Sequence, residues 1–266
     1  MSFIVVLLSL WLLVTLNFGC NSSGTVDPAD LRPFHRISGA AVTVCDPVRD
    51  TLNDEPVGTA AIVRLTRNEQ PLDGASVRLG AMVLEEADST YRFVDSSCTV
   101  FSAAQYYLIL EEGIRLDAQV PIQFADTFRV EITQPANRIS NGNQTVSLTW
   151  TGSARSEGYV MAAVLKDSVR TGFGYSSYVT SQTTFASFPT EAFYQSGRQQ
   201  PDTGWYYLYV YSFAGIPDSA LAEPYLPMSL PSQLPGLSYQ VRDLEARFGT
   251  VRVARHDSVQ VVLLSQ

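Results

Sequence analysis

Short runs of β-branched, aliphatic and aromatic residues, separated by turn-forming residues, constrain the fold of this 266-residue chain most strongly. In the first half, the pattern predicts strands at 40–44, 59–65, 75–83, 90–94, 106–111 and 128–132. In the second half, it predicts strands at 146–150, 158–161, 204–210, 250–254 and 258–264. Asp73-Gly74 and Gly113 are typical turn residues between such runs. Because long stretches of helical periodicity are largely absent, we expect an all-β protein.

An apolar run precedes the predicted strands. Residues 3–16 (FIVVLLSLWLLVTL) contain 14 almost uniformly apolar positions, whereas a membrane-spanning helix needs about 20. A run of this length suits the apolar stretch of an export signal. We therefore predict a cleaved signal peptide at 1–19 and an exported protein, with an uncleaved N-terminal anchor as the alternative.

Gly19-Cys20 at the end of this run resembles the lipobox of bacterial lipoproteins. The resemblance implies that Cys20 is diacylated, becomes the new N-terminus and holds the protein to membrane lipid. Asn21 after the cysteine resembles the outer-membrane sorting pattern of some Gram-negative bacteria. We expect a lipid-anchored cell-envelope protein, on the periplasmic or surface face of the outer membrane. The polar residues up to position 36 are expected to form a flexible tether, so that 20–36 is the attachment region.

Two further resemblances divide the rest of the chain. The stretch 70–79 (QPLDGASVRL), followed by Tyr91, 107–110 and 120–122, resembles transthyretin-like and carboxypeptidase-regulatory-like modules. This implies a β-sandwich at 37–132, followed by a linker at 133–143 that is rich in Pro, Asn and Gly. The runs 146–150, 158–161 and 204–210 resemble strands B, C and F of a fibronectin type III module. That resemblance implies that Trp150 and Tyr159 pack in the core and that Tyr206 forms a corner bond.

We therefore expect two immunoglobulin-like β-sandwich domains in tandem after the cleaved signal peptide. The second domain would span 144–266 and differ from its family by a proline-rich insertion at 216–248.

The strand predicted around 204–210 has an unusual face. With the period-two alternation of a strand, Tyr206, Leu208 and Val210 point to one side. The opposite side carries an aromatic row made of Trp205, Tyr207, Tyr209, Tyr211 and Phe213. An exposed aromatic row would bind sugar rings or apolar polymers by stacking. The other interpretation is that the proline-rich segment folds back over the row and makes a small second core.

Acidic and histidine residues provide few catalytic candidates. Glu85-Glu86 and Glu111-Glu112 are adjacent on predicted strands and so point to opposite faces, which prevents either pair from acting across one cleft. Asp46, Asp50, Asp54 and Glu55 suit either a calcium site or an ordinary acidic loop, without EF-hand spacing. His35 lies in the expected tether, and His256 in an expected turn between the last two strands. We assign no catalytic residue, metal or cofactor, although a site built from distant acids stays open.

Cys45 and Cys98 remain once Cys20 is assigned to lipid. Disulfides persist in exported proteins, so these residues suit either a disulfide or two buried thiols.

Charge limits the classes of partner. The chain has 18 basic and 26 acidic residues, for a net charge of -8, which argues against binding nucleic acid. We predict a non-catalytic lipoprotein that acts as a binding or scaffolding module, with an envelope protein or glycan as partner. The alternative is a carbohydrate-binding or carbohydrate-active protein that uses the aromatic row.

Overall fold

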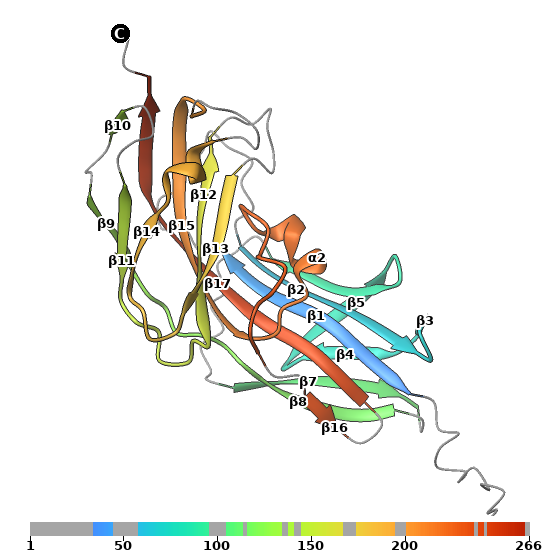
Figure 1. The fold of residues 1–266 in the computed structure, drawn as a ribbon. Coiled ribbons are helices and arrows are strands. Elements are labelled where there is room, and N and C mark those ends of the chain that lie inside the picture. The colour runs from blue at the N-terminus through green and yellow to red at the C-terminus, as the bar shows by residue number, and fades with distance from the viewer. Residues whose placement is uncertain are drawn as a thin grey trace, which may run out of the picture. The chain divides into compact units, whose positions relative to one another are not determined.

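The computed structural model describes residues 34–44, 58–95, 105–113, 116–134, 138–140, 145–166, 174–194, 201–236, 239–241 and 244–263. The stretch His35–Gln266 forms one compact unit. The described residues of this unit are dominated by strands, so the all-β prediction is confirmed (Figure 1).

The first eight strands lie between residues 35 and 123. They are β1 (His35–Val44), β2 (Gly58–Arg67), β3 (Gln70–Pro71), β4 (Ser76–Leu79), β5 (Met82–Ala87), β6 (Thr90–Asp95), β7 (Gln105–Glu112) and β8 (Leu116–Gln123). Two of their hairpins turn through non-glycine residues with positive φ, at Asn68-Glu69 and at Asp88-Ser89. Positive φ at both central residues is the geometry of a type I′ turn, which matches the twist of the flanking strands.

The second group begins with β9 (Val130–Gln134), β10 (Arg138–Ser140), β11 (Val146–Trp150), β12 (Gly158–Leu165), β13 (Gly174–Thr180) and β14 (Phe185–Phe188). It continues with the 3₁₀ helix η3 (Thr190–Phe193), the long strand β15 (Gly204–Gly215), the short helix α2 (Ser219–Ala222) and the 3₁₀ helix η4 (Glu223–Tyr225). The last strands are β16 (Tyr239–Val241) and β17 (Leu244–Val262). Asp218 caps α2, because its carboxylate accepts a hydrogen bond from the backbone N–H of Leu221 at 3.1 Å.

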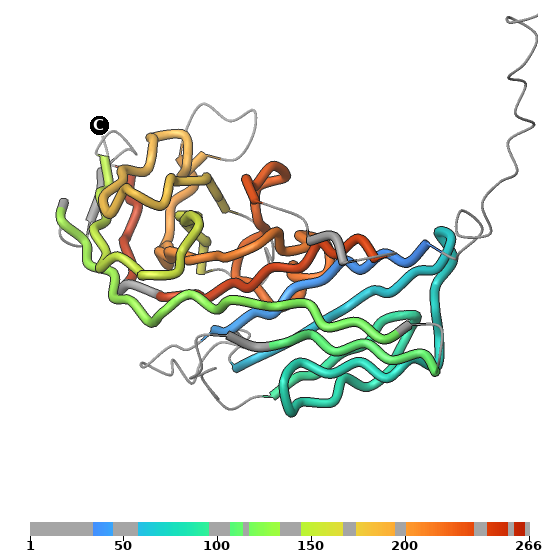
Figure 2. Tube along the Cα trace, turned by 90° about the horizontal axis from the view of Figure 1, so that it is seen from below, coloured from blue at the N-terminus to red at the C-terminus, as the bar shows by residue number. Residues whose placement is uncertain are grey.

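One sheet runs through both groups. Among the described residues, its order is β13-β12-β15-β17-β1-β2-β6-β5-β4-β7-β8, with β3, β10 and β16 on side branches, while β14-β11-β9 form a separate three-stranded sheet. The 19-residue strand β17 links the groups, because it pairs in parallel with β1 and antiparallel with β15. Figure 1 shows β17 crossing from beside β1 to beside β10 and β15, and Figure 2 shows the same strand from below.

Three large apolar cores pack against this sheet, and a smaller cluster joins Ala60 and Ile62 of β2 to Leu221 of α2. The first core joins β1, β2, β6 and the start of β17 to β4, β7 and β8, and includes Leu65, Tyr91, Leu110 and Phe248. The second core joins β12, β15 and the end of β17 to the three-stranded sheet, and includes Trp150 and Tyr159. The third core lies on the other face of β1, β12, β15 and β17. The middle of the long sheet is therefore buried on both faces.

Most predicted strands are present, but two predictions are wrong. The run 75–83 is not one strand, since it divides into β4 and β5 around Gly80, whose φ is +62°. The run 250–264 is not a hairpin, since Arg255-His256-Asp257 continues β17 instead of turning. A register shift opposite Tyr207 and Leu208 inserts an extra residue there. Such a bulge reverses which side chains of the strand point inward. In the sequence, this change of alternation suggested two separate strands.

Candidate functional site

The aromatic row on β15 is mostly buried. Tyr207, Tyr209, Tyr211 and Phe213 are each at most 1% exposed and belong to the third core, whereas Trp205 is 45% exposed. The neighbouring rings of Tyr209 and Tyr211 have centroids 6.4 Å apart. Of the two interpretations of this row, the structure supports burial for four of its five members. Trp205 alone remains accessible as an aromatic contact from the row.

The segment after β15 covers these rings. Ala222 of α2, then Leu226 and Leu230, are buried in the third core with the tyrosines. The hydroxyl of Tyr211 accepts a hydrogen bond from the Met228 N–H at 3.0 Å and lies 3.3 Å from the Met228 carbonyl oxygen, to which it donates. The segment approaches β17 closely as well, because a side chain at Gly249 would collide with the backbone nitrogen of Pro217. These contacts hold the cover (residues 216–236) against the sheet.

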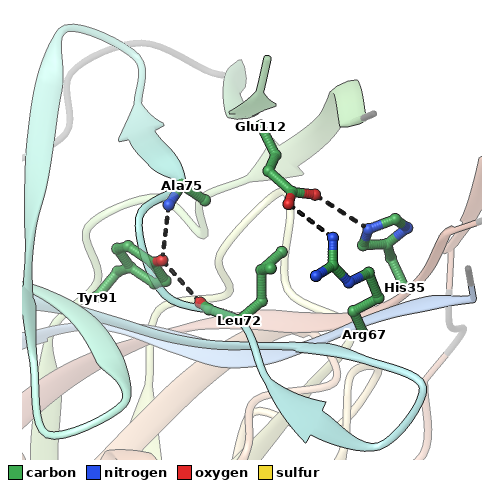
Figure 3. Close-up of polar contacts among 6 residues, drawn as sticks. All are labelled: His35, Arg67, Leu72, Ala75, Tyr91 and Glu112. Atoms are coloured by element: carbon green, nitrogen blue, oxygen red, sulfur yellow. Dashed lines mark hydrogen bonds and ion pairs between the residues drawn. The ribbon is translucent and has the colours of Figure 1, made fainter. Parts of the chain in front are cut away.

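The residues that carry the two sandwich resemblances have structural roles. The rings of Trp150 and Tyr159 have centroids 5.3 Å apart in the second core. The Tyr206 hydroxyl lies 3.2 Å from the carbonyl oxygen of Asp202, four residues upstream. In the first group, the buried Tyr91 hydroxyl donates to the Leu72 carbonyl at 2.8 Å and accepts from the Ala75 N–H at 3.0 Å (Figure 3).

The adjacent carboxylates form separate interactions. Glu111 lies 2.9 Å from Arg78 with both side chains partly exposed. Glu112 lies 2.8 Å from Arg67, and its side chain is only 17% exposed. On β5, Glu86 accepts a hydrogen bond from the Gly74 N–H at 2.7 Å. The structure therefore brings neither adjacent pair together as two facing carboxyl groups.

His35 occupies a place that the sequence did not predict. It was expected in the tether, but it is the first residue of β1 and is 2% exposed. Its Nε2 atom lies 3.6 Å from Oε2 of Glu112, which places His35, Arg67 and Glu112 in one cluster (Figure 3). The signal was available in the alternation, because His35 shares a strand face with Ile37 and Ala41 of the first core. The cluster ties the ends of β1, β2 and β7 together.

An arginine pocket of about 340 Å³ lies on the face of β1, β2 and β17 that also carries the third core. It is lined by Arg36, Ile37, Ser38, Arg64, Thr66, Glu245 and Arg247. Ser38 stands opposite Arg64 on β2 and opposite Arg247 on β17, so these side chains form one row across three strands. Arg36 lies two positions along β1, opposite Glu245. Three neighbouring strands therefore present three guanidinium groups to one hollow.

The charges of the arginine pocket are only partly compensated. Arg36 donates through Nε to Glu245 at 3.1 Å and lies 3.6 Å from the exposed Glu69. Arg247 lies 3.8 Å from the same Glu245. Within the described part of the chain, Arg64 makes no ion pair. The lining holds three guanidinium groups and one carboxylate, and with the neighbouring Glu69 counted as well the positive charges still outnumber the negative ones by one.

Several predicted site residues lie outside the described residues. These are Cys20, Cys45 and Cys98, together with Asp46, Asp50, Asp54 and Glu55. The lipid anchor, the disulfide and the calcium alternative therefore stay predictions. His256 is placed in β17.

Comparisons with known proteins add no family name. Among the residues for which the fold is described, no helix has the length and apolar character needed to cross a membrane. The same residues contain no group of three or more side chains suited to hold a metal ion. Neither a protein-family model nor a curated protein matches this chain.

Proposed function

We propose that this protein is a lipid-anchored bacterial envelope lipoprotein that acts as a non-catalytic binding or scaffolding module. The observation that carries the proposal is the apolar run 3–16 followed, after Asn17-Phe18, by Gly19-Cys20, which resembles a lipobox. β1 begins at His35, only 15 positions after Cys20. Anchoring at Cys20 would therefore hold a compact all-β unit close to a membrane surface.

We assign 37–132 to a transthyretin-like sandwich and 144–266 to a fibronectin type III-like sandwich. The contact of Trp150 with Tyr159 and the bond from Tyr206 to Asp202 support the second assignment. The Tyr91 hydroxyl, which links Leu72 and Ala75 within the 70–79 stretch, supports the first.

The binding surface favoured by this proposal is the arginine pocket. The carbohydrate alternative is weakened because four of the five rings in the aromatic row are covered. Trp205 would be its remaining contact, and a single exposed ring is common on ordinary protein surfaces.

Replacing Cys20 tests the anchor. We expect wild-type protein to incorporate labelled palmitate and to sediment with membranes, whereas Cys20→Ser should incorporate no label. Cys45→Ser is the matched control, because it removes a different cysteine and should leave labelling intact. Palmitate labelling of Cys20→Ser at the wild-type level would refute the anchor. Membrane retention of an unlabelled Cys20→Ser protein would favour an uncleaved N-terminal helix.

A further inference from the structure

We infer that the arginine pocket binds a phosphate group, and that this group belongs to a phospholipid headgroup of the membrane that holds the chain. The choice of membrane phosphate as the source rests on the proposed lipid anchor. The preference of the pocket for phosphate rests on the residues that line it.

The lining suits a phosphate chemically. A guanidinium group offers a planar pair of N–H donors that matches two phosphate oxygens. Because adjacent strands are about 4.8 Å apart, the backbones carrying Arg64 and Arg247 are about 10 Å apart across β1. Their long side chains can therefore converge on one anion above Ser38, whose hydroxyl adds a donor at the floor.

The charge of the arginine pocket favours an anionic ligand. The chain as a whole carries a net charge of -8, yet this hollow gathers three arginines. Glu245 interacts with Arg36 and Arg247 and so orients two of the guanidinium groups. Arg64 adds a positive charge with no carboxylate partner in the described part of the chain. An anion bound between Arg64 and Arg247 would complete the pairing.

Proximity favours the membrane as the source of that anion. Arg36 is the second residue of β1, 16 positions after Cys20. A fully extended chain spans at most about 3.6 Å per residue, so the start of β1 lies within about 60 Å of an acylated Cys20. Tethering at this range raises the effective concentration of headgroup phosphates at the pocket without any further contact.

The test uses the full chain in micelles of an uncharged detergent. One arm adds phosphatidic acid, a second adds diacylglycerol with the same acyl chains, and a third adds inorganic phosphate. We expect phosphatidic acid to raise the thermal unfolding midpoint by about 5 °C at saturation, because a ligand that binds only the folded state stabilises it. Diacylglycerol, which lacks the phosphate, should produce no shift.

Variants locate the binding. Arg64→Gln combined with Arg247→Gln should abolish the shift and lower the affinity at least tenfold by calorimetric titration. Arg64→Lys keeps the charge but loses the planar pair of N–H donors of the guanidinium group, and should weaken binding severalfold. Arg129→Gln is the matched control, because Arg129 is an exposed arginine just before β9 and does not line the pocket. Because the altered side chains are exposed, all variants should unfold at the wild-type midpoint without ligand.

A shift with phosphatidic acid in wild type and Arg129→Gln that is lost in the double variant supports phosphate binding in the arginine pocket. Equal affinity for inorganic phosphate and phosphatidic acid would overturn the headgroup source and leave a soluble-anion pocket. No shift with either ligand, or the same shift in all variants, would overturn the inference. Because the protein is already in detergent, the result does not depend on whether Cys20 carries lipid.

Discussion

At the scale of single residues, polar groups buried under the sheet fix the geometry of the first core. Tyr91 is 1% exposed, and its hydroxyl is both a donor to Leu72 and an acceptor from Ala75. Burial raises the pKa of Tyr91 above its usual value of 10.0, and the nearby charges of Glu86 and Asp73 act in the same direction. The folded protein therefore retains this proton more tightly than the unfolded chain does.

The pH dependence of stability has a definite sign at Tyr91. Because the folded-state pKa of Tyr91 is raised, the contribution of Tyr91 to stability is fully present below pH 10 and is lost as the pH rises through the raised value.

Tyr91→Phe should lower the free energy of unfolding by about 1 to 3 kcal/mol at pH 8, since two backbone groups lose their partner. Urea unfolding at pH 8 and pH 11 should show that this difference shrinks at the higher pH. Tyr107→Phe, at an exposed position, is the control. An unchanged difference would contradict this role of the Tyr91 proton.

At the scale of elements, β15 is buried on both faces by different partners. Tyr206, Leu208 and Val210 belong to the second core, while the tyrosines between them belong to the third. A strand with two buried faces needs large apolar groups at successive positions, and this explains the aromatic row without a ligand. Prolines in the cover suit a segment that packs through side chains and turns instead of pairing as a strand.

Truncating the aromatic row should separate its buried and exposed members. Tyr209→Ala should lower the free energy of unfolding by about 3 to 5 kcal/mol, because it leaves a cavity between the sheet and the cover. Trp205→Ala, at a position that is 45% exposed, should cost less than half as much. Denaturant unfolding of both variants gives the comparison. Equal small losses would mean that the cover does not pack on the row.

At the scale of the whole unit, β17 makes three cores dependent on one strand. Leu244, Ala246 and Phe248 lie in the first core, and Val259 and Val261 lie in the second. Between them, Val251 and Val253 belong to the third core. The strand pairs with β1 and β15 over the same central residues, so neither group has a complete sheet without it.

Sharing β17 should make unfolding cooperative. We expect calorimetry to give one transition for His35–Gln266 within the full chain, with equal calorimetric and van't Hoff enthalpies. Leu244→Ala alters the first core and Val259→Ala the second, and each should lower the midpoint of that single transition. Two separate transitions, each moved by only one of the variants, would show that the groups unfold independently.

The sequence alone determined the all-β class and most strand positions, because alternation and turn residues are local signals. β11 is at 146–150 as predicted, and Gly74 and Gly113 have the positive φ that their turns suggested. Local signals failed at Asn68-Glu69 and Asp88-Ser89, because Asn, Asp and Ser favour turns but these pairs lack the glycine that most clearly marks positive φ. They failed at β17 too, because a bulge shifts the phase of the alternation within one strand.

Only the tertiary structure decided which polar residues meet. His35, Arg67 and Glu112 come together because the start of β1 lies beside the ends of β2 and β7. Arg36, Arg64 and Arg247 come together because β1, β2 and β17 are paired in register. The sequence allowed either an exposed or a covered aromatic row. Leu226 and Leu230 pack in the third core with the row, and the row is therefore covered. Pairings between residues so far apart in the chain depend on strand order and register, which local patterns do not encode.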